Sequence, residues 1–168
     1  MEKIKKKRSV LLILLLFVVI GGIVGYFFFR DSPVSDLFDS NAKDYQSNIK
    51  KPEDWPKSKI AFPAYGDMQI EEGTDKLYIA LVNPDFNEAN LQYILYLNGE
   101  NKSDEFYETG LISPGKAVTE VSLPRKLAKG EYTIYLHTKA FAPKDPDTKL
   151  NSVQTSFKLT VLEKGDKK

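Results

Sequence analysis

Hydrophobic and polar residues follow different patterns in successive parts of this chain. Residues 10–29 are uncharged and apolar, residues 30–58 are polar without a sustained period, and residues 59–163 alternate between apolar and polar positions. Alternation with a period of two is typical of strands that bury one face. We therefore predict a membrane-spanning helix, an extracellular linker and an all-β domain, in that order, with residues 164–168 as a polar tail.

The alternating region predicts seven or eight strands. The clearest is the last, in which Val153, Phe157 and Val161 alternate with polar residues. Residues 76–82 are apolar on both faces, which is typical of a central strand. Pro114-Gly115 has the residues of a type II turn. The predicted strands are a broken first strand at 60–62 and 68–70, then 76–82, 91–97, 106–109, 117–123, 132–140 and 153–161.

Short strands separated by turns, with no long helix between them, favour an antiparallel sandwich of immunoglobulin type. Tyr132 lies two residues after Gly130, where such domains place a tyrosine whose hydroxyl bonds to the upstream backbone. Ile134 stands where antibody domains have their second cysteine, and the strand 91–97 contains no tryptophan. The sequence therefore predicts an immunoglobulin-like shape rather than a relative of antibodies.

The charge around the apolar stretch predicts its orientation. At about 1.5 Å per residue, a helix over 10–29 matches the roughly 30 Å hydrocarbon core of a bilayer. Basic residues stay on the cytoplasmic side, so residues 1–9 are expected inside and the C-terminal domain outside the cell membrane. The residues expected to anchor the span are Lys5, Lys6, Lys7 and Arg8 on the inner side, and Tyr26 and Phe29 on the outer side.

Two features of the span leave alternatives open. A cleaved secretory signal also begins with basic residues, but this stretch is longer than a signal's apolar region and ends in bulky aromatic residues, which favours an uncleaved anchor. Gly21 and Gly25 form a small-xxx-small pair suited to a homodimer of helices. Glycine is also common in membrane helices, so ordinary helix composition explains the same pair.

The side chains that catalysis requires are scarce. The 168 residues include no cysteine and one histidine, His137, which the alternation places outward on a strand. A catalytic triad or a zinc site therefore lacks its other members. The carboxylates at 71–75 and 145–147 do not have the spacing of a calcium loop, and Asp145 is expected to cap a turn. We predict a non-enzymatic protein without cofactor or metal ion.

The domain is also an unsuitable partner for nucleic acid, because its region of the sequence is mildly acidic and has no basic stripe. If the strands 91–97, 132–140 and 153–161 share one sheet, an outward patch forms that is suited to a protein partner. The same residues are also explained as cross-strand pairs of an ordinary exposed face. The predicted patch consists of Ile94, Tyr96, Tyr135 and His137.

The loops 83–90 and 141–150 are a second candidate for partner binding. They are expected to emerge at the same end of the domain and to present Phe86 and Phe141, as the loops of variable domains do. Phenylalanine in a loop is frequently tucked beneath it, so packing within the domain is the alternative explanation of both residues. Both candidates concern a protein partner on the cell surface.

The chain resembles small membrane-anchored surface proteins of Gram-positive bacteria, some of them carried on conjugative elements. The resemblance covers most of 60–161 and rests on Asn83-Pro84, GLISPG at 110–115, LAKGEY at 127–132 and Leu150-Asn151. These are turn and core residues, so they carry fold and no site residue. Together with the anchor they predict a recognition or scaffolding module that contacts another envelope protein. The alternative is a structural spacer or accessory subunit of a cell-envelope or conjugative, secretion-type machine.

Overall fold

The computed structural model describes residues 18–21 and 34–165. The chain divides into two units, Met1–Val34 and Ser35–Lys168. Residues 18–21, which include Gly21, are helical. Among the described residues, no helix has the length and apolar character needed to cross a bilayer. The rest of the predicted span and its flanks lies outside the described residues, including Lys5, Lys6, Lys7, Arg8, Gly25, Tyr26 and Phe29.

Residues 34–165 form an all-β structure, as predicted. Apart from the strands, this part of the chain contains two short 3-10 helices. The elements in chain order are η1 (Val34–Leu37), β1 (Lys43–Asp44), β2 (Met68–Glu71), β3 (Lys76–Asn83), β4 (Asn90–Leu97), η2 (Lys102–Asp104), β5 (Glu105–Glu108), β6 (Lys116–Ser122), β7 (Gly130–Phe141) and β8 (Lys149–Leu162).

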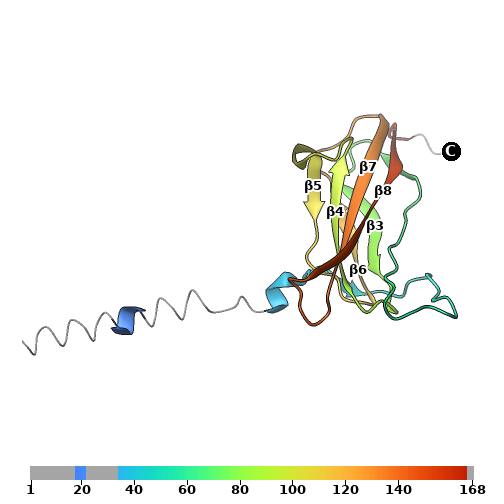
Figure 1. Ribbon diagram of the computed structural model, residues 1–168. Coiled ribbons are helices and arrows are strands. Elements are labelled where there is room, and N and C mark those ends of the chain that lie inside the picture. The colour runs from blue at the N-terminus through green and yellow to red at the C-terminus, as the bar shows by residue number, and fades with distance from the viewer. Residues whose placement is uncertain (1–17, 22–33, 166–168) are drawn as a thin grey trace, which may run out of the picture. The chain divides into compact units, whose positions relative to one another are not determined.

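The strands form two sheets around one core (Figure 1). One sheet has three strands in the order β1-β6-β3, and the other has five in the order β2-β8-β7-β4-β5. The strands pair antiparallel except for β2, which runs parallel to β8. The expected sharing of one sheet by β4, β7 and β8 is confirmed. Both sheets contribute to a single hydrophobic cluster that includes Leu77, Leu81, Tyr93, Leu136 and Leu159.

Two local predictions are confirmed by the backbone. The Tyr132 hydroxyl donates a hydrogen bond to the Ala128 carbonyl at 2.9 Å, which joins the start of β7 to the preceding loop. Gly115 has a φ of +77°, as the third position of a type II turn requires, and the Lys116 N–H closes the turn on the Ser113 carbonyl. These contacts fix where β6 and β7 begin.

The predicted linker differs from the structure over most of its length, because residues 35–58 belong to the same unit as the strands. β1 pairs with β6, and Phe38 forms a parallel bridge with Leu111. The Asp39 carboxylate accepts the Gly110 N–H at 2.9 Å. A Cβ atom on Gly110 would lie 2.7 Å from the Asp39 nitrogen, so this close approach requires glycine. Backbone and carboxylate hydrogen bonds, rather than a row of apolar side chains, hold this segment in place. Its sequence therefore shows no apolar period.

The prediction that β3 is a central strand is wrong. β3 lies at the edge of the three-stranded sheet, and its Tyr78 side chain is 68% exposed. The Tyr65 hydroxyl covers part of the open edge, donating to the Ala80 carbonyl at 3.0 Å and accepting the Val82 N–H at 3.4 Å. At Ala80 and Val82 the edge of β3 is therefore closed by a tyrosine hydroxyl rather than by a second strand.

Two buried asparagines close the end of the sandwich near the loop 84–89. Asn83 donates to the carbonyls of Ala89 and Ile112, both at 2.8 Å, and accepts from Asn87 at 2.9 Å. Asn87 also bonds both the N–H and the carbonyl of Ala61. Ala61 therefore pairs with a side chain, which explains why the strand predicted at 60–62 is absent from the described elements.

A buried tyrosine lies next to these asparagines. The Tyr93 hydroxyl donates to the Val82 carbonyl at 2.7 Å, and the Tyr93 ring packs edge-on against Tyr65 with centroids 6.3 Å apart. The side-chain polar atoms of these tyrosines and asparagines all have hydrogen-bond partners, which is what burial demands. We refer to four residues as the inner cluster: Tyr65, Asn83, Asn87 and Tyr93.

Candidate interaction face of the five-stranded sheet

The register of β4 and β7 places the four residues of the predicted patch side by side. Ile94 pairs with His137, and Tyr96 pairs with Tyr135. The intervening Leu95 and Leu136 are fully buried in the core. Because successive side chains of a strand point to opposite faces, the four predicted residues share the face that points away from the core.

Half of this patch is less exposed than the sequence suggested. Ile94 is 4% exposed and Tyr96 is 7% exposed, whereas Tyr135 and His137 are half-buried. The Tyr96 ring packs on the His137 imidazole, with centroids 4.7 Å apart. Burial raises the pKa of Tyr96, and the neighbouring Glu105 carboxylate raises it further. The accessible part of the patch is therefore narrower than predicted and centres on Tyr135 and His137.

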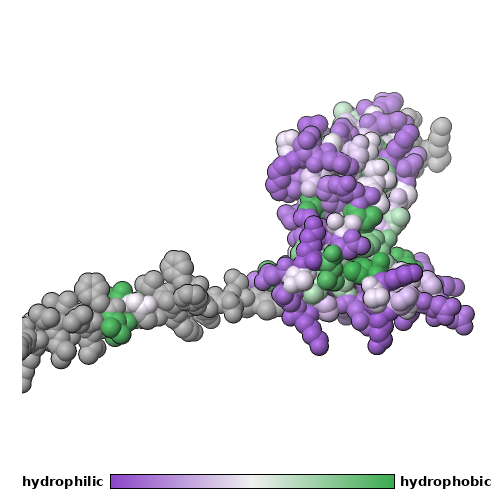
Figure 2. All heavy atoms as spheres, viewed as in Figure 1, coloured by the Kyte–Doolittle hydropathy of each residue, from purple (hydrophilic) through white to green (hydrophobic). Residues whose placement is uncertain are grey.

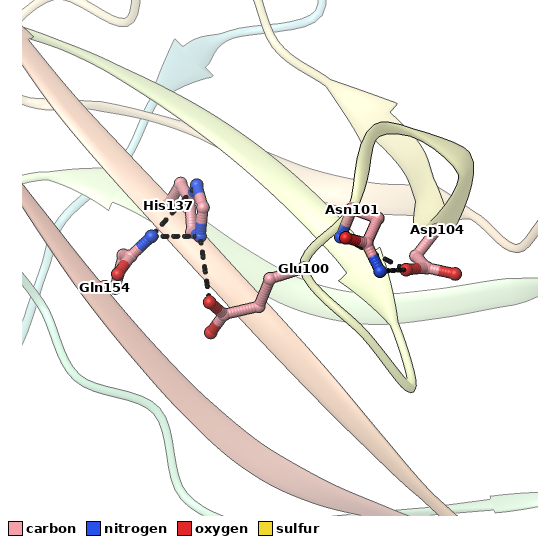
Figure 3. A network of polar contacts seen from close by, with 5 residues as sticks. All are labelled: Glu100, Asn101, Asp104, His137 and Gln154. Atoms are coloured by element: carbon pink, nitrogen blue, oxygen red, sulfur yellow. Dashed lines mark hydrogen bonds and ion pairs between the residues drawn. The ribbon is translucent and has the colours of Figure 1, made fainter.

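His137 has polar neighbours on two other elements (Figure 3). The side-chain nitrogen Nε2 of Gln154, which lies opposite His137 on β8, is 2.6 Å from the imidazole Nε2. The Glu100 carboxylate approaches the same imidazole atom to 4.0 Å from the loop after β4. The His137 side chain remains 18% exposed. We refer to five residues as the outer cluster: Tyr96, Glu100, Tyr135, His137 and Gln154.

The loop that carries Glu100 is held by its own hydrogen bonds. The Asp104 carboxylate accepts both the backbone and the side-chain N–H of Asn101 at 3.1 Å, as Figure 3 shows in part. The next turn is closed by Lys102, whose ammonium lies 2.7 Å from Glu105 Oε1. These contacts keep the loop close to Tyr96 and Glu100 close to His137.

A hollow of about 290 Å³ adjoins the outer cluster between β7 and the first half of β8. Apolar surface appears in the region that β8 crosses, between polar zones of the same unit (Figure 2). A rigid face with aromatic, polar and apolar groups and an adjoining hollow suits contact with a protein. The hollow is lined by His137, Lys139, Lys149, Ser152, Val153 and Gln154.

The second predicted surface is largely closed. The loops 84–89 and 142–148 do meet at one end, where Glu88, Ala89 and Pro143 line a hollow of about 210 Å³. Phe86, however, packs edge-on against Trp55, with ring centroids 5.6 Å apart. Phe141 ends β7 and pairs with β4 and β8. Phe86 therefore packs within the domain and Phe141 belongs to a strand rather than to a loop, so neither is presented from a loop as expected.

The carboxylates of the domain have ordinary structural roles. Thr148 donates its hydroxyl to Asp145 Oδ2 at 2.5 Å and its N–H to the Asp145 carbonyl at 3.0 Å, so Asp145 caps a turn as predicted. Within residues 18–21 and 34–165, no three histidine, cysteine, aspartate or glutamate side chains gather where they would hold a metal ion. Hydrogen bonding and packing are the interactions that the outer cluster offers.

Comparison of the chain with protein-family models, curated proteins and solved structures gave no match. The resemblance to Gram-positive surface proteins therefore stays a prediction. Function has to be inferred from the chain's own residues and their geometry.

Proposed function

We propose that this chain is a non-enzymatic, membrane-anchored module that recognises another envelope protein through the outer cluster of its extracellular domain. The observation that carries the proposal is the arrangement around His137. Side chains from β4, β8 and the loop after β4 converge on the partly exposed imidazole of His137 on β7. Interfaces favour aromatic residues held on rigid elements, because such residues lose little conformational freedom on binding.

The strand order supports an immunoglobulin-like identity for the domain. The run β8-β7-β4 corresponds to the G-F-C strands of that fold, and β6-β3 corresponds to its E-B pair. The hydrogen bond from Tyr132 to Ala128 is the tyrosine corner expected at the start of the F strand. Domains of this class commonly present one sheet face to protein partners, which fits the position of the outer cluster.

The anchor follows from the sequence of residues 10–29 and the basic residues before it.

A second candidate is a rigid spacer or accessory subunit of a larger envelope machine, including a conjugative one. It is favoured by the docking of residues 38–44 on the domain through Asp39, Gly110 and β1. Exchange of the domain for an unrelated sandwich separates the two candidates. A spacer tolerates the exchange, whereas a recognition module loses its function.

A photo-crosslinking amino acid at Tyr135 tests the recognition proposal in intact cells. Tyr78 is the matched control, because it is also a tyrosine on a strand and is 68% exposed on the other sheet. We expect one envelope protein to be captured reproducibly from position 135 and not from position 78, and its capture to fall roughly tenfold when His137→Ala is added. Failure to capture any protein from position 135 contradicts the proposal.

A further inference from the structure

One side of β8 is open over most of its length. β2 pairs with β8 only at Leu159–Leu162, so residues 149–158 have no strand neighbour on that side in the described part of the chain. The Lys158 N–H donates to the Asp67 carboxylate at 2.8 Å, away from β7. Because alternate residues of a strand direct their backbone groups to the same side, Ser152, Gln154 and Ser156 direct theirs to the open edge.

The composition of this edge is unusual for an unpaired strand. Residues 150–157 (LNSVQTSF) contain no charge and no proline, and Ser152, Gln154 and Ser156 are exposed. Proteins normally protect open edges with lysine, proline, bulges or short strands. One of the outward donors, the Ser152 N–H, already donates a hydrogen bond to the side-chain oxygen of the adjacent Asn151. The remaining outward groups form a template for a further strand.

The other sheet edges of the described domain are protected. β3 is covered by the Tyr65 hydroxyl at Ala80 and Val82. The remaining edge strands are short, which limits pairing with another strand: β5 and β2 have four residues each, and β1 has two. β5 also carries two glutamates. The β8 edge is the long, uncharged exception within residues 34–165.

We propose that two copies of this chain pair antiparallel through their β8 edges, about a two-fold axis at Val153, and join their five-stranded sheets into one. A two-fold axis perpendicular to a sheet pairs residues of the same face, so Ser152 faces Gln154 of the second copy and Leu150 faces Ser156. Neither pair opposes like charges. The contact adds self-association to the recognition of another protein.

The charged residues that flank the edge oppose a shift of the pairing toward the C-terminal end of β8. With the axis at Val153, Lys149 lies opposite Phe157, and Lys158 remains outside the pairing. An axis at Gln154 would bring Lys158 into the pairing opposite Leu150, and it would break the bond of the Lys158 N–H to Asp67. In the Val153 register the Ser152 N–H exchanges only its local bond to the adjacent Asn151 side chain for the Gln154 carbonyl of the second copy. A second copy is therefore a self-complementary occupant, since the same uncharged segment supplies both strands.

A single cysteine tests the axis directly, because the natural chain has none. At a non-hydrogen-bonded antiparallel pair the Cα atoms lie about 4.5 Å apart, within the range that a disulfide spans. We expect Val153→Cys in the full chain, in its native membrane and under mild oxidation, to give mainly disulfide-linked dimer on a non-reducing gel. Tyr78→Cys, exposed on the other sheet, should remain monomeric. Equal dimer from both variants, as pairing through the membrane helix alone would produce, overturns the proposal.

Hydrogen exchange on the unmodified full chain in mild detergent tests the pairing without a substitution. At a total concentration tenfold above the dimer dissociation constant about a fifth of the chains remain monomeric, so the Gln154 and Ser156 amides should exchange roughly fivefold more slowly than in the diluted monomer. Exchange that is independent of concentration overturns self-pairing. So does protection that appears only when other envelope proteins are added, because the added strand would then be foreign.

Discussion

The inner and outer clusters contain similar side chains but are held in opposite ways. In the inner cluster, Asn83 and Tyr93 are fully buried and their polar atoms bond backbone groups of other segments. In the outer cluster, His137 is partly exposed and its polar neighbours are side chains. Bonds to buried backbone groups are costly to lose, whereas side-chain contacts at the surface are easily replaced by water. The comparison indicates that the inner cluster maintains the fold and that the outer cluster is available for binding.

The largest expected effect is the loss of Asn83. Asn83→Ala removes the hydrogen bonds to the buried carbonyls of Ala89 and Ile112 and the acceptor for Asn87, so three bonds of the inner cluster are lost at once. We expect the free energy of unfolding to fall by about 3–5 kcal/mol. Urea unfolding of the full chain in mild detergent, followed by the fluorescence of Trp55, measures this change.

Asn101→Ala is the matched control for that variant. Asn101 is an exposed asparagine that bonds only Asp104, so its loss should cost about 1 kcal/mol or less. Equal destabilisation by the two substitutions would contradict the distinction between buried and exposed polar groups.

The second prediction uses the alkaline titration of Tyr65. Burial raises the pKa of Tyr65 to about 12 from an ordinary value of 10.0. Between these values the unfolded chain loses the proton and the folded chain keeps it. Stability is therefore constant below pH 10 and falls as the pH rises toward 12, by about 2–3 kcal/mol from this residue.

Tyr65→Phe isolates this contribution. At neutral pH the variant should be less stable by about 1 kcal/mol, because the bond to the Ala80 carbonyl is lost. Above pH 10 the difference should shrink and then reverse, since phenylalanine does not titrate. Parallel stability curves for the two proteins between pH 9 and 12, measured by urea unfolding, would show that Tyr65 does not contribute.

The fold was predictable where a strand buries one face and was not where pairing depends on single bonds. β7 and β8 follow from alternation, because Ile134 and Phe157 are inward-facing residues of long strands. β1 has two exposed residues held by backbone pairing with β6, so it leaves no hydrophobic pattern. The edge position of β3 was missed because Tyr65, distant in sequence, covers it.

The outer cluster was predicted in part for the same reason. The pairing of Tyr96 with Tyr135 follows from two adjacent antiparallel strands. The contact of Glu100 with His137 depends on a loop conformation, and the contact of Gln154 with His137 depends on the register in which β7 and β8 pair. Neither contact can be recognised from the spacing of residues along the chain. The packing of Tyr96 on His137, and with it the burial of Tyr96, was therefore not predicted.

The third prediction concerns the loop that links the two strands beside the outer cluster. Asp104→Ala removes both bonds to Asn101 and should release the loop that carries Glu100. We expect a loss of about 1 kcal/mol in the free energy of unfolding. Hydrogen exchange of the Asn101 and Asp104 amides should accelerate, while exchange in β7 stays unchanged. Acceleration throughout β7 would show that the loop supports the sheet itself.

The smallest effect on stability is expected at the centre of the outer cluster. His137→Ala removes a half-buried ring whose polar contacts are side chains, so the free energy of unfolding should fall by about 1 kcal/mol or less. Capture of the partner from position 135 should nevertheless fall roughly tenfold, because an interface residue of this kind contributes more than 1 kcal/mol to binding. Thr133→Ala, on the same face of β7, should change neither quantity. If His137→Ala destabilised the domain as much as Asn83→Ala, or left capture unchanged, the outer cluster would be a second structural centre rather than a binding site.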